Sequence, residues 1–519
     1  MTNTDYTNTL LTARNNSPAP EQIQQNYPIP MLFPIILATT CQLASPTGTT
    51  SRVQMHQRQA IHLQNGAEIL AFDHQSQSLF VIGAGGLTVL NLNPAFRNPL
   101  SIRVDQWEGN IPSWEPTSIA IDPRNRGFAA ISWIPSPKDQ QHGIVTIFDT
   151  QTHQVITKLD AGYHPDCIAF SPDGSKLVIA NECEPDATDL QGGITIFNLE
   201  SVTQSSDFQS APVTGASINF QKPFLSDNAD LSTLRISASQ QATPWIDIEP
   251  EYLAVSNDGV WVSLQENNAL ARFDFETRIW SSFIPLGSSN APFDPSDDQT
   301  IQIEDQSPIR MLHQPDTIAL FESGNTSYIL LANEGEQGDS DSIRFHEAIK
   351  EGLIDPQVAQ STINLSNANL VISTIDGDTD HDGDIDQPTA LGSRSISIHE
   401  ATTGKQIWNS GSQIELITGM LFPDLYNDAD SRSDQSGPEP EGLAIGYIDG
   451  KTLGFVGLER THAILMYDLT NPSAPQFLDA APLDPSCRPE GLKFIQIDGR
   501  SFLAVAAEKC EELILFEIR

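Results

Sequence analysis

Positive charge is scarce in this sequence. The 519 residues contain 27 Lys and Arg against 67 Asp and Glu, which gives a formal net charge of −40. A protein surface that binds nucleic acid needs Lys and Arg to contact the phosphates, and anionic membranes attract clusters of basic residues. We therefore expect neither partner. The acidic excess favours multivalent cations, or simply a soluble surface whose charges repel one another.

Long apolar runs are also missing. No stretch of about 20 apolar residues occurs, so we expect no transmembrane helix. The polar start of the chain is typical of disorder, and the apolar segment Met31–Cys41 is short and interrupted by Pro34. A signal region or a lipid anchor at Cys41 is one interpretation of this disordered or targeting segment, which we place at residues 1–54.

Seven copies of one pattern occupy the rest of the chain. They begin at residues 67, 116, 165, 250, 315, 440 and 489, and the steps 67 to 116, 116 to 165 and 440 to 489 are each 49 residues. Each copy alternates apolar and polar residues and carries turn signals such as Asp-Gly, followed by further strand-like segments. Four antiparallel strands every 40 to 50 residues are typical of a β-propeller blade.

The last copy ends after three predicted strands, and a fourth-strand-like segment, 58–66, precedes the first copy. The sequence thus predicts an all-β, seven-bladed β-propeller over 55–519, with an N-terminal strand that completes the last blade and removes the open edges. We place loop insertions in the third and fifth blades, at about 200–245 and 337–392. Seven hairpins in an open sandwich are the alternative.

Five of the seven copies carry an acid at the start of their first strand and another at the end of their second. Because these two positions are neighbours in an antiparallel hairpin, we expect all ten acids around one opening of the channel. The pairs are Asp166 and Glu182, Glu251 and Glu266, Asp316 and Glu334, Glu441 and Glu459, and Glu490 and Glu508. So many carboxylates need raised pKa values or bound cations, of which Ca²⁺ is the best suited. The alternative is that each acid caps a loop.

A second cation signal lies at 376–386, with the letters DGDTDHDGDID. The acids alternate as in the D-x-D-x-D-G calcium loop, although Thr389 replaces the usual final Glu and no flanking helix pair is evident. We predict a shortened Ca²⁺ loop, and a solvated acidic turn is the alternative. Its ligands would be Asp378, Asp380, Asp382, Asp384 and Asp386.

Only five cysteines are present. Cys167 and Cys183 flank the third hairpin, and Cys487 and Cys510 flank the seventh, so we predict two disulfides and an oxidising compartment. Four separate buried thiols are the alternative. Cys41 is left over.

Basic residues also occur near the predicted opening, among them Arg394, Arg432, Arg460 and Arg488. Bound cations with arginines beside them could hold a phosphate or another oxyanion. Each arginine alone is more often the salt-bridge partner of a neighbouring acid. The sequence has no P-loop, G-x-S-x-G, H-E-x-x-H or dinucleotide-binding motif, and no nucleophile stands out.

The segments ANECEPD, LLANEGE, DGDTDHDGDIDQ, LGSRSISI and SRSDQSGPEPEGLAIG resemble the choice-of-anchor I proteins. The resemblance covers roughly residues 60–519 and implies a secreted or surface β-propeller. Similar sequences carry names such as atypical alkaline phosphatase and mesenchyme-specific cell surface glycoprotein.

Two functions remain open from the sequence, with a lactonase-like hydrolase as a weaker third. The first is a Ca²⁺-dependent phosphoesterase acting on a phosphorylated small molecule, with Glu334 or Glu459 as base and Arg460 or Arg488 stabilising the transition state. The second is a non-catalytic surface or matrix protein that binds a surface ligand and uses Ca²⁺ only to rigidify loops. For both we expect a monomer located outside the cell, in the periplasm or on the cell surface.

Overall fold

The computed structural model describes residues 53–519, apart from 93–99, 104–113, 139, 184–189, 211–212, 228, 238–239, 241, 337–340 and 365. The chain divides into two units, Met1–Ser51 and Arg52–Arg519. All described residues lie in the second unit, and Cys41 lies outside them. No helix among the described residues is long and apolar enough to cross a membrane.

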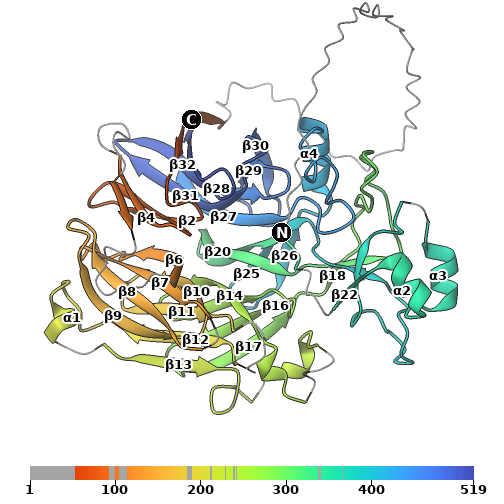
Figure 1. The fold of residues 1–519 in the computed structure, drawn as a ribbon, viewed down its shortest axis with the longest axis horizontal. Coiled ribbons are helices and arrows are strands. Elements are labelled where there is room, and N and C mark those ends of the chain that lie inside the picture. Colours follow the sequence, from red (N-terminus) through yellow and green to blue (C-terminus); the bar gives the residue numbers. More distant parts are fainter. Residues whose placement is uncertain are drawn as a thin grey trace, which may run out of the picture. The chain divides into compact units, whose positions relative to one another are not determined.

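Seven four-stranded antiparallel sheets make up most of the second unit (Figure 1). In six of them the strands follow chain order from the first strand to the fourth. They are β2 (Ile69–Asp73), β3 (Ser78–Gly83), β4 (Gly86–Asn91) and β5 (Leu100–Arg103); β6 (Trp114–Ile121), β7 (Phe128–Pro135), β8 (Gly143–Asp149) and β9 (Val155–Gly162); β10 (Pro165–Phe170), β11 (Lys176–Asn181), β12 (Gly193–Asn198) and β13 (Gly215–Asn219); β14 (Pro250–Val255), β15 (Gly259–Leu264), β16 (Ala269–Asp274) and β17 (Ile279–Pro285); β20 (Pro315–Ser323), β21 (Thr326–Asn333), β25 (Ser395–Glu400) and β26 (Gln406–Asn409); β27 (Pro440–Ile448), β28 (Lys451–Leu458), β29 (Ala463–Asp468) and β30 (Gln476–Pro482).

The seventh sheet joins the two ends of the unit. Its order is β1 (Met55–His62), β33 (Glu512–Ile518), β32 (Arg500–Ala507) and β31 (Pro489–Ile497), and β1 pairs antiparallel with β33. The first strands also contact one another in sequence, from β2 to β6 and onward to β31, which contacts β2 again. The predicted all-β fold of four-stranded antiparallel sheets is confirmed.

The hairpins form where the sequence places turn residues. In the turn after β27, Asp449 and Gly450 have φ of 50° and 79°, and Asp498 and Gly499 have φ of 50° and 73° after β31. Two consecutive left-handed residues make the type I′ turn, which matches the twist of two paired strands and favours Asp-Gly. Between sheets, apolar side chains interlock: Phe455 and Met466 pack in one buried cluster with Leu503 and Phe516 of the next sheet.

A five-stranded sheet is added to the fourth and fifth copies. Its order is β18 (Ser288–Ser289), β19 (Arg310–Leu312), β24 (Thr389–Ala390), β23 (Val371–Ser373) and β22 (Ser342–Arg344), and β19 pairs parallel with β24. Helices α2 (Phe345–Glu351) and α3 (Pro356–Thr362) pack with it around their own apolar cluster.

The remaining helices are short. Helix α4 (Gln413–Leu421) follows β26. The region predicted as the first insertion, 200–245, contains helix α1 (Asp207–Ser210) and the 3₁₀ turn η2 (Leu231–Thr233), but it also supplies β13, the outermost strand of the third sheet. A further 3₁₀ turn, η4 (Pro244–Ile246), precedes β14.

Candidate metal centre

The acids at the starts of the first strands all line one cavity of about 200 Å³, which we call the channel cavity. Each comes from a different four-stranded sheet. They are Glu68, Asp166, Glu251, Asp316, Glu441 and Glu490, and Thr117 takes the corresponding place in the second sheet. All five first-strand acids predicted as metal ligands are therefore brought together, with Glu68 as an unpredicted sixth.

A β-bulge lies at the acid in five of these six strands, and only the ladder after Glu68 runs without one. In the third sheet the ladder pairs Pro165 with Asn181 and resumes only at Ile168, and the same shift follows the first Pro of β14, β20, β27 and β31. Proline has no N–H to give to a ladder, so it is tolerated at the first position of a strand. The bulge then leaves the acid unpaired and re-aims its side chain.

The second-strand acids follow the ends of the neighbouring strands. Glu182, Glu334 and Glu459 come directly after β11, β21 and β28. The amide of Glu459 donates to the carbonyl of Glu439 at 2.9 Å, and that of Glu182 donates to His164 at 3.0 Å. These hydrogen bonds extend each hairpin past its proline and hold the two acids of a pair at the same end.

Burial and mutual repulsion raise the pKa values of these carboxyls. Burial, followed by repulsion from Asp316, raises the pKa of Asp166 to about 7. Burial, followed by Glu508 and Glu68, raises the pKa of Glu490 to about 8. The pKa of Glu441 is also well above its ordinary value, mainly because of burial and then Glu334. A divalent cation would offset both the burial of the charged carboxylates and their mutual repulsion, because it supplies the opposite charge that they lack.

Three acids from two neighbouring sheets come closest to a preformed cation site, which we call the carboxylate triad. One oxygen from each of Glu334, Glu441 and Glu459 lies within 4.8 Å of the other two. Glu441 Oε2 is buried without a hydrogen-bond partner among the described residues. Gln265 Nε2 donates to Glu334 Oε2 at 2.9 Å and orients it. Oxygen ligands around a hard cation at about 2.3–2.6 Å are the preference of Ca²⁺, so the triad fits that ion.

Two arginines contact the triad through Glu459. Arg488 Nη1 lies 2.8 Å from Glu459 Oε1, and Arg460 Nε lies 3.3 Å from Glu459 Oε2. Arg460 also pairs with Glu439 at 2.6 Å. Both predicted catalytic arginines thus stand beside the triad, and both already serve as salt-bridge partners. The Arg460 and Arg488 side chains are 18 % and 23 % exposed, so solvent reaches both.

A strained turn presents one more acid to this cluster. Asn427, Asp428, Ala429 and Asp430 have φ of 44°, 57°, 53° and 72°. Left-handed backbone costs a non-glycine residue about 1–2 kcal/mol, so four in a row require strong support from their surroundings. The turn places Asp428 Oδ1 at 3.4 Å from His462 Nε2 and Oδ2 at 4.0 Å from Arg488.

Arg394 is linked to this turn through Glu415, whose Oε1 accepts a hydrogen bond from Asn427 Nδ2 at 3.3 Å. The Arg394 side chain is 2 % exposed and pairs with the buried Glu415 at 2.7 Å. It also donates to the carbonyl oxygens of Ser433 at 2.6 Å and Gln435 at 2.8 Å. The interpretation of Arg394 as part of an oxyanion site is therefore wrong: it is a buried structural residue. Arg432 pairs with Glu439 at 2.9 Å.

Sequence reasoning missed Glu249, Asp428 and Glu439. Glu249 is 7 % exposed, and burial, then repulsion from Glu266 and Glu182, raises its pKa to about 10. A signal was available for two of them, because Glu249 and Glu439 each directly precede the first proline of a copy, as Arg488 does. Asp428 lies in a loop outside the repeated pattern, so no repeat position points to it.

The acidic loop at 376–386 brings three of its five predicted ligands together. Oxygens of Asp378, Asp380 and Asp386 lie within 4.8 Å of one another, whereas Asp382 and Asp384 fall outside this group. The backbone folds around them: Asp378 accepts from the amide of His381 at 2.7 Å.

An ion pair links this loop to Glu266, one of the second-strand acids. Asp376 pairs with Arg235 at 2.7 Å, and Arg235 Nη1 donates to the carbonyl of Glu266 at 3.0 Å. Arg235 Nη2 also donates to Ser373 Oγ at 3.2 Å, on strand β23. The conformation of the acidic loop is therefore linked to the position of Glu266.

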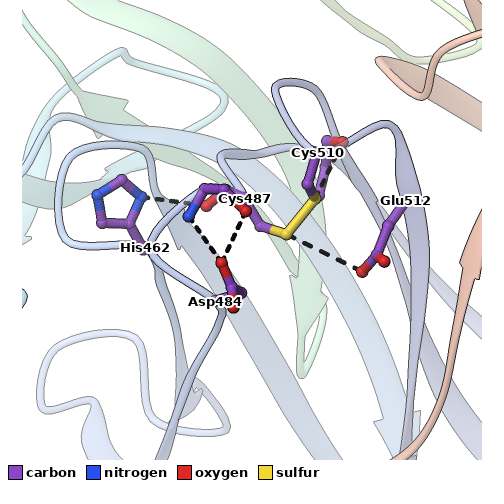
Figure 2. The surroundings of a disulfide bond; sticks show 7 residues. His462, Asp484, Cys487, Cys510 and Glu512 are labelled. Carbon is purple, nitrogen blue, oxygen red and sulfur yellow. Dashed lines mark hydrogen bonds between the residues drawn. A yellow bond between two sulfur atoms is a disulfide. The ribbon is translucent and has the colours of Figure 1, made fainter. Parts of the chain in front are cut away.

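The two cysteine pairs behave differently. Cys487 and Cys510 form a disulfide with a Cα–Cα distance of 4.8 Å (Figure 2). His462 Nδ1 lies 3.1 Å from the carbonyl of Cys487, so the disulfide, His462 and Asp428 form one connected group.

The predicted disulfide between Cys167 and Cys183 is wrong, because both thiols are free and buried. Pro165 pairs with Asn181; Cys167 lies two residues from that pair in one direction along the ladder, and Cys183 two residues in the other. A four-residue offset separates them by roughly 13 Å along the strands, beyond disulfide reach. Cys487 and Cys510, in contrast, both lie beyond the same end of their hairpin, where Pro489 pairs with Ala507.

The model of the choice-of-anchor I domain matches residues 68–472. The chain belongs to the choice-of-anchor I family. The matched region contains the carboxylate triad, the strained turn and the acidic loop, but not Arg488, Glu490 or the disulfide.

Two animal proteins are similar to parts of this choice-of-anchor I chain. Gigasin-3a of Magallana gigas is 34 % identical over 113 residues, which cover 20 % of this chain and 39 % of that protein. The mesenchyme-specific cell surface glycoprotein of Strongylocentrotus purpuratus is 25 % identical over 217 residues, which cover 34 % of this chain and 28 % of that protein. The matches therefore span well under half of either relative.

Solved structures similar to this choice-of-anchor I chain share little sequence with it. A β-propeller domain from Myceliophteria thermophila aligns with 90 % of this chain and all of its own at 10 % identity and a TM-score of 0.46. Hydrazine synthase of Kuenenia stuttgartiensis aligns with 88 % of this chain and 97 % of its own at 12 % identity and a TM-score of 0.46.

Proposed function

We propose that the seven four-stranded sheets are the blades of one β-propeller, which β1 closes by pairing with β33. The cyclic contacts among the first strands and the shared lining of the channel cavity support this arrangement. We further propose that the protein works outside the cell or on its surface. Membership of the choice-of-anchor I family, a relative named as a cell surface glycoprotein and the Cys487–Cys510 disulfide support that location.

We propose that the channel opening binds Ca²⁺ and hydrolyses phosphate esters. The observation that carries this proposal is the carboxylate triad, with Arg460 and Arg488 both in contact with Glu459. Three carboxylates hold a hard cation, and two guanidinium groups next to it attract a phosphate. The remaining predicted metal ligands of the channel cavity would hold further cations.

Each residue of the cluster has a distinct part in this proposal. Bound Ca²⁺ would polarise the phosphate and lower the pKa of a coordinated water. Glu334, which Gln265 orients, would accept the proton of that water. Arg460 and Arg488 would stabilise the charge that develops on the phosphoryl oxygens.

The competing proposal is a non-catalytic surface protein with structural calcium. The link from the acidic loop through Asp376 and Arg235 to Glu266 favours it, because calcium there would stiffen the opening without taking part in chemistry. In that case Arg460 and Arg488 remain salt-bridge partners of acids and do not contact a substrate.

One experiment separates the two proposals. The full chain is stripped of metal, Ca²⁺ is titrated back, and hydrolysis of p-nitrophenyl phosphate and bis-p-nitrophenyl phosphate is followed together with thermal unfolding. For a phosphoesterase, activity and melting temperature rise together and Glu459→Gln removes activity. Glu322→Gln, an exposed acid near the opposite end of β20, serves as the control. A rise in melting temperature with no hydrolysis of either substrate refutes the catalytic proposal and supports the structural one.

A further inference from the structure

A second cavity, of about 480 Å³, lies between the sheet β6–β9 and the sheet β10–β13. We call it the inter-sheet groove. Asp160 and Gly162 of β9 form one wall, and Thr195 of β12 and Ser217 of β13 form the other. The groove shares no lining residue with the channel cavity. Its volume lies in the range of about 300–1,000 Å³ that is usual for small-molecule sites.

The groove is hollow because several residues on one face of the third sheet have small side chains or none. The ladder places Gly193 opposite Asn219, Thr195 opposite Ser217 and Phe197 opposite Gly215. A Cβ atom added to Gly215 would lie 2.7 Å from Cε1 of Phe197, so the ring occupies the space that a side chain would need. In the fourth sheet, the outermost strand β17 instead carries Trp280, which is fully buried.

The lining is nearly neutral, in contrast to a chain with a formal net charge of −40. Its one acid, Asp160, pairs with His142 at 2.8 Å, and Lys158 is the remaining charged side chain. The other polar groups are amides and hydroxyls. With one lysine, one histidine and one carboxylate, the lining has little net charge to attract a phosphate and too few acids to hold a metal ion.

Several of these groups are open to a ligand. The hydroxyls of Ser217 and Tyr163 and the Nε2 amide nitrogen of Gln191 make no hydrogen bond within the described part of the chain, whereas Gln191 Oε1 accepts from Asn219 Nδ2 at 3.2 Å. Amides and hydroxyls that both donate and accept match a ligand whose groups do the same. The half-buried ring of Tyr163 adds apolar surface among them, whereas Phe197 is 2 % exposed and forms the floor of the groove.

We infer that the inter-sheet groove binds an uncharged oligosaccharide. Sugar hydroxyls donate and accept hydrogen bonds at once, and the face of a sugar ring packs on an aromatic side chain such as Tyr163, so a neutral, hydroxyl-rich ligand matches the amides and hydroxyls of the lining. The groove reaches the same end of β11 as the channel opening, since Asn181 lines the groove and the next residue, Glu182, is one of the second-strand acids. The inference does not depend on the phosphoesterase proposal.

Saturation-transfer NMR on the full chain in EDTA tests this inference without any contribution from bound cations. The probes are cellobiose, maltotriose and N,N′-diacetylchitobiose, with glucose 6-phosphate as the charged comparison. We expect transfer to at least one of the three neutral sugars. Transfer to none of them, or to glucose 6-phosphate alone, overturns the inference.

Two matched variants locate the binding. Ser217→Trp fills the groove from an exposed position on β13, and Ser281→Trp places the same side chain at an exposed position on β17. Thermal unfolding shows that each variant is folded. We expect Ser217→Trp to weaken sugar binding by at least about tenfold while Ser281→Trp leaves it unchanged. Equal binding by the two variants places the sugar elsewhere and refutes the site.

Discussion

Removing the guanidinium of Arg394 should destabilise the protein and weaken the support of the turn at 427–430. The side chain is 2 % exposed and its partner Glu415 is 1 % exposed. It also donates to the carbonyl of Asp294 at 2.6 Å and lies 4.7 Å from the centre of the Phe293 ring. In Arg394→Met the apolar stem remains, but Glu415 loses its counter-charge while still buried.

The expected loss is about 3–5 kcal/mol in the free energy of unfolding, because breaking a buried pair leaves an uncompensated charge. A unit as long as Arg52–Arg519 has an unfolding entropy of about 1 kcal/mol/K, so the melting temperature should fall by about 3–5 °C. Urea unfolding followed by tryptophan fluorescence measures the change. Replacing both partners, as Arg394→Met with Glu415→Gln, should recover part of the loss.

The matched control is Arg500→Met. Arg500 is 56 % exposed and pairs with Glu517 at 2.8 Å, and an exposed pair contributes at most about 1 kcal/mol. If Arg394→Met costs no more than this control, the buried pair is not what supports the turn at 427–430. The account of that strained turn would then fail with it.

Three further outcomes follow from the structure. In EDTA the free energy of unfolding should fall as pH rises from 6 to 8, because the folded state keeps protons on carboxyls such as Glu490 and Glu266, each with a pKa of about 8. The expected slope is about 1.4 kcal/mol per pH unit for each excess proton, and Ca²⁺ should suppress it. A free energy of unfolding that rises with pH contradicts this account. Cys487→Ser opens a cross-link spanning 23 residues and should cost about 2–4 kcal/mol in urea unfolding, whereas Cys183→Ser should leave the response to a reducing agent unchanged. Ala429→Gly should stabilise by about 1 kcal/mol, the opposite of the usual effect, because Ala429 has φ of 53°; a loss of stability would show that the turn is not strained.

The repeated pattern predicted much of the architecture because it is local. Alternating residues, a leading proline and an Asp-Gly turn specify each hairpin within about 20 residues, and the acids follow from their place at the hairpin ends. The gathering of Asp166, Glu251 and Glu441 in one cavity then required only that equivalent strands lie side by side.

What the sequence could not predict depends on contacts between distant segments or on offsets within a ladder. Arg394 is buried because Asp294, 100 residues away, and the loop carrying Ser433 close over it. The free thiols of Cys167 and Cys183 result from a register that counting from the hairpin ends does not give.

The pairing of β1 with β33 constrains the order in which the molecule can be completed. Arg58 of β1 bonds to Glu517 of β33 across 459 residues, and Gln54 and Arg519 exchange backbone hydrogen bonds of 2.8 Å and 3.1 Å. Because β33 is synthesised after β1, β1 remains without this partner until the intervening strands have been made. Such a contact is slow to form, and until it does, both strands offer open edges to other chains. Deletion of the 7 residues of β33 should therefore increase aggregation.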